Sequence, residues 1–232
     1  MAPSALFSTC ARNVHAWAGG DCLLCGAESG PELLCPACIG ELPALPESCP
    51  QCALPSPAAA VCGSCINRSP HFDATLALWR YEFPCDGLVQ ALKYRAQFAL
   101  AGFFARSLAS RPLPEVDVVL PMPLHAKRLA ERGFNQALEI ARGLARYRGT
   151  PIEPRGVLRV KNTPPQTELP YEDRAKNVRG AFRCELDLSG ASVAVLDDVM
   201  TTGATLNELA RVLKRAGARR VENFVIARTV LR

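Results

Sequence analysis

Residues 193–205 read VAVLDDVMTTGAT, and this stretch decides the fold of the chain. Residues 193–196 are a short apolar run, which is typical of a strand buried on both faces. Two carboxylates follow, then a small, hydroxyl-rich segment, and then a helical apolar pattern that starts at Leu206. A strand, a polar loop and a helix N-terminus in this order indicate an anion site, because unpaired N–H groups and the helix dipole favour negative charge there.

The polar loop indicates a sugar phosphate as the ligand. Gly203 lets a ligand approach the backbone closely, and the threonines add hydroxyl donors. Asp197 and Asp198 would repel a phosphate, so we expect them to face the 2- and 3-hydroxyls of a ribose 5-phosphate, or a metal ion. Seven positions are expected to hold the ribose and its 5-phosphate: Asp197, Asp198, Thr201, Thr202, Gly203, Ala204 and Thr205. The simpler alternative, a helix cap beside a surface acidic pair, explains Thr205 but not the whole run.

The same run resembles the phosphoribosyl pyrophosphate (PRPP) signature of type I phosphoribosyltransferases. It has four apolar residues, Asp-Asp, two further apolar residues and then Thr-Thr-Gly-x-Thr. The resemblance implies an α/β fold with a parallel twisted sheet flanked by helices. It also implies PRPP as the ligand, with Mg2+ bridging its pyrophosphate and ribose hydroxyls.

A cysteine repeat occupies residues 22–65. Each half has two CxxC pairs separated by nine residues, and each cysteine recurs 27 positions later. The eight candidate metal ligands are Cys22, Cys25, Cys35, Cys38, Cys49, Cys52, Cys62 and Cys65. Four thiolates and no histidine favour zinc or iron, and zinc is the more typical choice for such ribbons. We therefore predict a small double zinc ribbon with two structural Zn2+ ions that supply folding energy.

The pairing of the four CxxC pairs is open from the sequence. Short loops favour sequential pairing within each half, since the shorter closure costs less entropy. Crossed pairing would instead join Cys22 and Cys25 with Cys49 and Cys52. A structural staple is the expected role, while redox chemistry and nucleic-acid contact are the alternatives. The acidic character of this segment counts against binding to a phosphate backbone.

The composition is that of a globular protein. The 232 residues are 49% hydrophobic and 21% charged, with a net charge of +5. Residues 1–70 carry five acidic and two basic side chains, whereas residues 71–232 carry 17 acidic and 25 basic ones. Anionic partners should therefore meet the second part. No apolar run is long enough to span a membrane, and no signal peptide is evident, so we expect a cytoplasmic protein in which cysteines bind metal.

A basic segment follows the second buried strand expected, at residues 116–120. Lys127, Arg128 and Arg132 lie there, followed by Gly133, which permits a tight turn. Such a segment after a strand could hold a pyrophosphate. A solvated basic helix face is the alternative. Lys93, in an expected helix at residues 87–94, could also reach a site, but the solvated end of a helix is the favoured interpretation.

The run RGFNQ at residues 132–136, with Arg128 before it, resembles the hallmark of the competence protein F (ComF) family. That family joins N-terminal cysteine knuckles to a phosphoribosyltransferase-type domain, and the resemblance covers nearly the whole chain. It implies an N-terminal extension at residues 1–20, a double zinc ribbon at residues 21–70 and a phosphoribosyltransferase-like domain at residues 71–232. The family name also implies a link to DNA uptake in natural transformation.

Residues 161–180 are rich in proline and charge, so we expect a long mobile loop that could act as a lid. Arg174 within it could close over the pyrophosphate. Short strands are expected at residues 74–83, 157–160 and 221–227, and a helix at residues 205–216. Strands that alternate with helices predict one parallel sheet with the two polar loops on the same edge.

Two functions remain open from the sequence. The first is PRPP-dependent transfer through an oxocarbenium-like state. Its catalytic candidates are Asp197, Asp198, Arg128, Arg132 and Arg174, and residues 71–95 would shape the acceptor pocket together with the ribbons. The second is a non-catalytic protein that binds nucleotides or single-stranded DNA, with the competence machinery as a further candidate partner. The few aromatic residues of the basic segment give no evident base-stacking platform.

Overall fold

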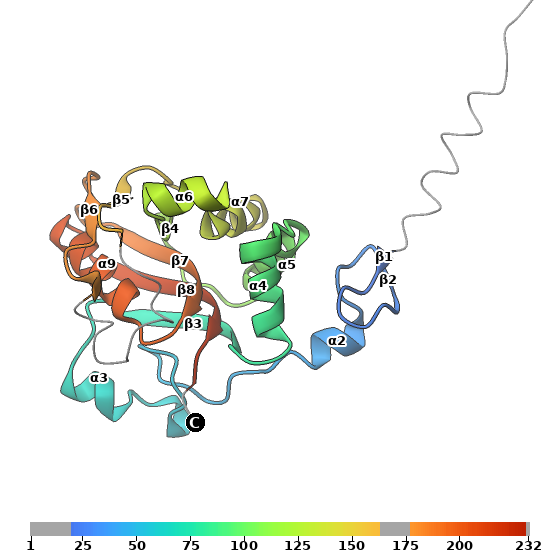
Figure 1. Ribbon diagram of the computed structural model, residues 1–232. Coiled ribbons are helices and arrows are strands. Elements are labelled where there is room, and N and C mark those ends of the chain that lie inside the picture. Colours follow the sequence, from blue (N-terminus) through green and yellow to red (C-terminus); the bar gives the residue numbers. More distant parts are fainter. Residues whose placement is uncertain (1–19, 163–176, 231–232) are drawn as a thin grey trace, which may run out of the picture. The chain divides into compact units, whose positions relative to one another are not determined.

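The computed structural model describes residues 20–162 and 177–230 (Figure 1). The described residues up to 42 form one compact unit, and those from 43 onward form a second. The predicted boundaries after residues 20 and 70 stay a prediction. Within the described ranges, none of the helices combines the length and the apolar character needed to cross a bilayer.

The first unit is a small ribbon. Strand β1 (Gly20–Asp21) pairs antiparallel with β2 (Glu28–Gly30), and the short helix α2 (Pro36–Gly40) follows. Few apolar side chains are buried in it, chiefly Leu34 and Leu42. A core of that size contributes little stability, which is why a bound metal would matter to it.

The second unit contains the predicted parallel sheet. Its order is β3 (Ala74–Arg80), β8 (Arg220–Arg228), β7 (Ser192–Met200) and β4 (Val118–Pro121), with all neighbours parallel. The central strands β7 and β8 are buried almost throughout, as expected for apolar runs covered on both faces. The sheet thus confirms the fold class.

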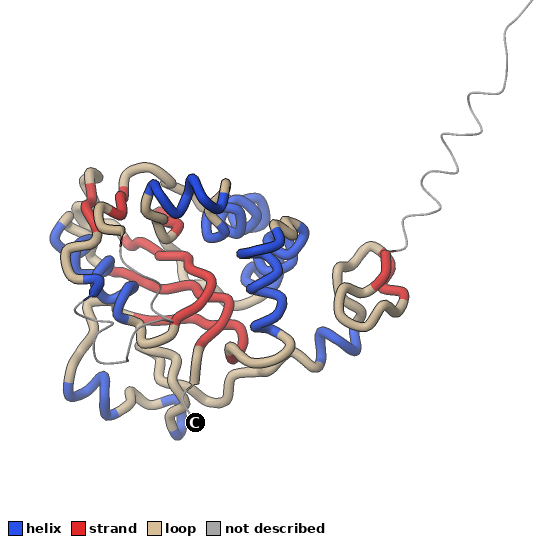
Figure 2. Tube along the Cα trace, in the orientation of Figure 1, coloured by secondary structure: helices blue, strands red, loops and turns tan. Residues whose placement is uncertain are grey.

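Helices cover both faces of the sheet (Figures 1 and 2). One face carries α4 (Cys85–Arg95), α5 (Ala99–Ala109) and α7 (Gln136–Arg148), and the other carries α9 (Ala204–Arg215). The chain passes from β3 across to β4 and later returns through β7 to β8. Because crossovers between parallel strands are right-handed, connections made in the two directions lie on opposite faces of the sheet. The short helix α6 (Ala126–Arg132) lies between β4 and α7.

Two strands differ from the expectation. Strand β7 ends at Met200 rather than at residue 196, because it stays paired with β8 up to Arg228. Strand β5 (Val157–Arg159) does not join the parallel sheet; it pairs antiparallel with β6 (Phe182–Cys184). Ile152 already forms a parallel bridge with Val119 beside β4, and the chain then turns away from the sheet.

The second cysteine segment packs within the same unit as the sheet. It includes the one-turn helix η2 (Pro57–Ala59) and helix α3 (Gly63–Asn67). The N–H of Thr75 donates to Pro50 O at 3.0 Å, and that of Arg80 donates to Pro43 O at 2.8 Å. This segment therefore lies along the outer edge of β3.

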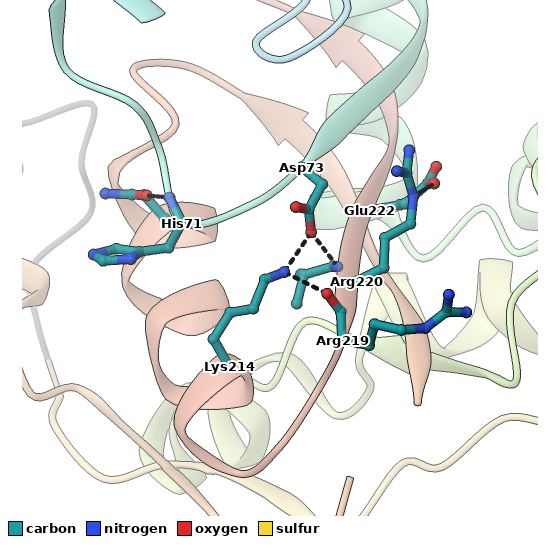
Figure 3. A network of polar contacts seen from close by, with 8 residues as sticks. His71, Asp73, Lys214, Arg219, Arg220 and Glu222 are labelled. Carbon is teal, nitrogen blue, oxygen red and sulfur yellow. Dashed lines mark hydrogen bonds and ion pairs between the residues drawn. The ribbon is translucent and has the colours of Figure 1, made fainter. Parts of the chain in front are cut away.

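A polar network fastens the starting ends of β3 and β8 (Figure 3). Asp73 Oδ2 accepts from the N–H of Val221 at 2.7 Å and forms an ion pair with Lys214 Nζ at 2.7 Å. The N–H of His71 donates to Asn207 Oδ1 at 2.7 Å. The contacts of Asp73 tie the end of α9 and the start of β8 to the entry of β3, and the contact of His71 holds the first turn of α9.

Candidate functional site

A cavity of about 620 Å3 lies at the carboxyl ends of the parallel strands. Five parts of the second unit line it: Tyr81 after β3, the end of α4, the segment from Met122 to Gln136, Arg159 of β5, and the junction of β7 with α9. The two polar segments predicted to share one edge therefore do meet there. Of the candidate residues, Asp197, Asp198, Thr201, Thr205, Arg128 and Arg132 all line this cavity.

Asp198 is buried at the cavity and paired with a lysine. Lys93 Nζ, in the last turn of α4, lies 2.9 Å from Asp198 Oδ2. Burial alone lowers the pKa of Lys93, but the charge and hydrogen bond of Asp198 and the charge of Asp197 raise it above its usual value. Lys93 therefore carries its positive charge directly against the Asp198 carboxyl group. The interpretation of Lys93 as a solvated helix end is wrong.

Asp197 has different surroundings from its neighbour. It is half-buried and lines the cavity, and its Oδ1 accepts from the N–H of Asp198 at 2.9 Å. Burial and the charge of Asp198 raise the pKa of Asp197 to about 7, although Lys93 and Arg159 act in the opposite direction. The two adjacent carboxyl groups thus differ in their partners, and Asp197 titrates near neutral pH.

The loop between β7 and α9 is shaped by short local contacts. Thr202 Oγ1 accepts from the N–H of Ala204, the first residue of α9, at 3.2 Å. Gly203 has φ of 80°, and a Cβ there would lie 2.6 Å from Met200 Cε, so only glycine fits without a shift. Thr201 and Thr205 line the cavity on either side of this turn.

The RGFNQ segment builds the opposite wall. Gly133 ends α6 in the left-handed conformation, with φ of 82°. Asn135 begins α7: its Oδ1 accepts from the N–H groups of Ala137 and Leu138, and its Nδ2 donates to Met122 O at 3.0 Å. Arg132 Nη1 donates to Gln136 Oε1 at 2.6 Å. The amides of this run therefore position Arg132 beside the cavity.

Arg159 completes the cationic lining. It is half-buried, its guanidinium lies 5.5 Å from the ring centroid of Phe182, and burial and the charge of Arg128 lower its pKa. Two guanidinium groups held close together are well suited to bind a polyanion. Arg174, the remaining candidate, lies outside the described residues.

The eight cysteines form two four-sulfur groups. Cys22, Cys25, Cys35 and Cys38 make the first, and Cys49, Cys52, Cys62 and Cys65 the second, each with all Sγ atoms within 4.8 Å of one another. This is the sequential pairing. The Sγ separations are 3.7 Å for Cys25–Cys35 and 3.6 Å for Cys52–Cys62, close to the edge of about 3.8 Å in a tetrahedron with Zn–S bonds of ~2.3 Å. The donor sets therefore fit zinc.

Comparison with known proteins agrees with both parts. The model of the double zinc ribbon domain matches residues 19–66, and that of the phosphoribosyl transferase domain matches residues 129–229. DNA utilization protein YhgH of Salmonella typhi is 32% identical over 206 residues, which cover 85% of this chain and 91% of that protein. Competence protein F of Haemophilus influenzae is 32% identical over 178 residues, covering 72% of this chain and 78% of that protein. The chain belongs to the ComF family.

A solved structure of glutamine PRPP amidotransferase from B. subtilis shows partial similarity to this ComF chain. It has 22% identity and a TM-score of 0.38, and the match covers 54% of this chain and 25% of the other.

Aromatic side chains gather at the mouth of the ComF cavity. Tyr94 and Phe134 line it, and Phe134 contacts Phe98 edge-to-face at 4.8 Å between ring centroids. The guanidinium of Arg132 lies 5.6 Å from the ring centroid of Tyr94. Tyr94 and Phe98 precede the basic segment in the sequence, so this grouping was not visible from that segment alone.

The sequence missed Lys93 and Arg159 as site residues of this ComF chain. Lys93 is more than a hundred positions before Asp198, so no local spacing connects the two. Arg159 is the last residue of β5, a strand that pairs outside the main sheet. The sequence did contain one signal for Lys93. It directly follows Leu92 and lies beside the apolar face of α4 formed by Leu88, Val89 and Leu92.

Proposed function

We propose that this ComF chain binds PRPP, or a related ribose 5-phosphate, in the cavity and catalyses phosphoribosyl transfer. One observation carries the proposal. A carboxylate pair, the threonine loop at the start of a helix, and arginines from other elements surround one cavity of about 620 Å3. These are the groups that a ribose diol, a 5-phosphate and a pyrophosphate require, respectively.

Each group has a distinct role in the proposed complex. The ribose 2- and 3-hydroxyls donate to Asp197 and Asp198, and Lys93 holds the Asp198 side chain in place through its ion pair. The 5-phosphate accepts from Thr201, Thr205 and the first N–H groups of α9. Arg128 and Arg132 contact the pyrophosphate. Mg2+ bound to PRPP would supply further charge neutralisation, and its oxygen ligands in the protein would come from Asp197 and Asp198.

Transfer breaks the bond between ribose C1 and the pyrophosphate oxygen. The electron pair leaves with pyrophosphate, whose charge Arg128 and Arg132 stabilise, and the carboxylates stabilise the positive charge that develops on the sugar. The acceptor then attacks C1 and loses a proton. Tyr94 and Phe134 supply a wall for a planar acceptor.

Pyrophosphate release from PRPP tests this function. With Mg2+ and a panel of nucleobases as acceptors, we expect release by the wild type and a loss of at least about a hundredfold for Arg128→Met/Arg132→Met. Arg146→Met on the exposed side of α7 is the matched control and should retain wild-type turnover. If the wild type bound PRPP but released no pyrophosphate with any acceptor, the transfer reaction would be contradicted and only ligand binding would remain.

A second candidate is binding of single-stranded nucleic acid, favoured by the aromatic cluster beside Arg128 and Arg132. Successive bases could stack on Tyr94 and Phe98 while the arginines contact phosphates. The two relatives described above are named for DNA utilization and competence, which agrees with this function. We expect a labelled oligonucleotide to bind with steep salt dependence and Tyr94→Ala/Phe98→Ala to weaken it. Salt-insensitive binding, or none, would contradict this candidate.

A further inference from the structure

Arg228, the last residue of β8, is the largest fully buried side chain in the described part of the protein. Only 2% of it is exposed. A buried guanidinium is costly unless its donors are satisfied, so its partners show what it holds in place.

Backbone carbonyls from three segments accept from this guanidinium. Nε donates to Cys52 O at 2.8 Å, and Nη1 donates to Met200 O at 3.0 Å and to Thr229 O at 2.7 Å. Nη1 also donates to Thr201 O. One rigid planar group thus spans the second cysteine segment, the end of β7 and the start of the ligand loop.

The guanidinium of Arg228 connects two candidate sites, the second four-sulfur group and the ligand cavity. Cys52 is a ligand of the second four-sulfur group, and its knuckle is closed by the N–H of Ala53 donating to Cys49 O at 2.9 Å. Ala53 has φ of 57°, a conformation that is strained for alanine, so the turn needs outside support. Thr201 lines the cavity and leads directly into the turn at Gly203.

We propose that Arg228 is a positioning residue that couples metal occupancy of the second four-sulfur group to the ligand loop at residues 201–205. Metal bound at the second four-sulfur group fixes the position of the Cys52 carbonyl. That carbonyl holds the guanidinium of Arg228, and the guanidinium holds the Thr201 carbonyl. Loss of the metal releases the Ala53 turn, removes one acceptor from a buried cation and loosens the loop. The effect on PRPP rests on the proposed function; the effect on the loop does not.

The cysteine repeat provides a matched pair of variants. Cys35 and Cys62 are equivalent positions, each the N-cap of a short helix, α2 and α3 respectively. Cys35→Ser and Cys62→Ser therefore weaken one metal site each by the same chemical change. Hydrogen exchange of the amides in residues 201–205 should be faster in Cys62→Ser than in Cys35→Ser. The affinity for PRPP with Mg2+ should fall by about tenfold or more in Cys62→Ser, within the usual range of such couplings.

Arg228 itself is tested against an arginine on the same strand. Arg220, at the start of β8, pairs with Glu222 at 2.5 Å, so Arg220→Met is the control for Arg228→Met (Figure 3). We expect faster loop exchange and weaker PRPP binding in Arg228→Met alone, and partial recovery in Arg228→Lys, which restores a charged donor. Recovery by lysine distinguishes positioning from simple filling of space.

A third experiment uses the wild type alone, so its result does not depend on whether a variant folds. Zinc removal by a chelator should speed exchange at residues 201–205, and PRPP with Mg2+ should slow zinc release from the second group, because coupling is reciprocal. Unchanged loop exchange after zinc removal would overturn the proposal. If the wild type fails to bind PRPP while the loop still responds to zinc, the proposed function fails and the coupling stands.

Discussion

Asp197 and Asp198 are adjacent on β7 but have different surroundings. Lys93 Nζ lies 2.9 Å from Asp198 Oδ2, while burial and the neighbouring charge raise the pKa of Asp197 to about 7. A carboxyl group that lines a cavity and has a raised pKa is typical of functional sites.

The stability of the protein should depend on pH through Asp197. Its folded-state pKa lies above the unfolded value of about 3.9, so its contribution is fully present below pH 4 and is lost as pH rises through 7. Asp197→Asn should abolish this loss. Relative to the variant, the wild type should lose roughly 4 kcal/mol of unfolding free energy between pH 4 and 8, measured by urea denaturation. If the unfolding free energies of both proteins changed equally with pH, that result would contradict the raised pKa of Asp197.

Lys93 should matter through the charge that it neutralises. Lys93→Met leaves Asp198 buried without its lysine, which should lower the free energy of unfolding by about 3 kcal/mol. The double variant Lys93→Met/Asp198→Asn should recover much of that loss, because neither charge remains. Thermal unfolding of the three proteins at pH 7 measures this. Additive losses in the double variant would show that the pair is not coupled.

At the scale of elements, local motifs were predictable and distant pairings were not. The signature at residues 193–205 predicted a buried strand and a helix start, because apolar runs, glycine and hydroxyl residues act on their immediate neighbours. The length of β7 escaped prediction, since its pairing with β8 extends through polar positions. The pairing of β5 outside the main sheet was also not predicted, because its partner β6 begins only at Phe182, far along the chain.

Asn135 offers a test of how an element positions the site. Asn135→Ala removes the cap of α7 and the bond to Met122 O, so it should cost about 1–2 kcal/mol in unfolding free energy. It should also weaken ligand binding by shifting Arg132. Asn135→Asp keeps an acceptor for the cap but removes the Nδ2 donor, so it separates the two effects. Wild-type affinity in both variants would contradict a positioning role for this turn.

The whole molecule combines an acidic, cysteine-rich segment with a basic domain. The repeat predicted both four-sulfur groups, because ligand spacing is local. It could not predict that the second group shares a compact unit with the sheet while the first belongs to another unit. That difference depends on contacts such as Thr75 with Pro50, which sequence spacing does not encode.

Removal of metal should therefore have two consequences. Metal analysis should find two zinc ions per chain, and chelation should unfold residues 20–42 because their apolar core is small. Chelation should also lower the melting temperature of the second unit by several degrees, since the second group packs beside β3. Limited proteolysis and calorimetry with and without chelator measure both. An unchanged melting temperature would show that the second metal site contributes nothing to the sheet.

Calorimetric titration of the wild type with PRPP and Mg2+, beside Asp197→Asn/Asp198→Asn, tests the central claim most directly. We predict saturable binding by the wild type with a dissociation constant in the micromolar range, roughly −8 kcal/mol, and a loss of at least about a hundredfold in the double variant. Equal binding by both folded proteins, or no magnesium-dependent heat with the wild type, would contradict the assignment of the cavity to a phosphoribosyl ligand.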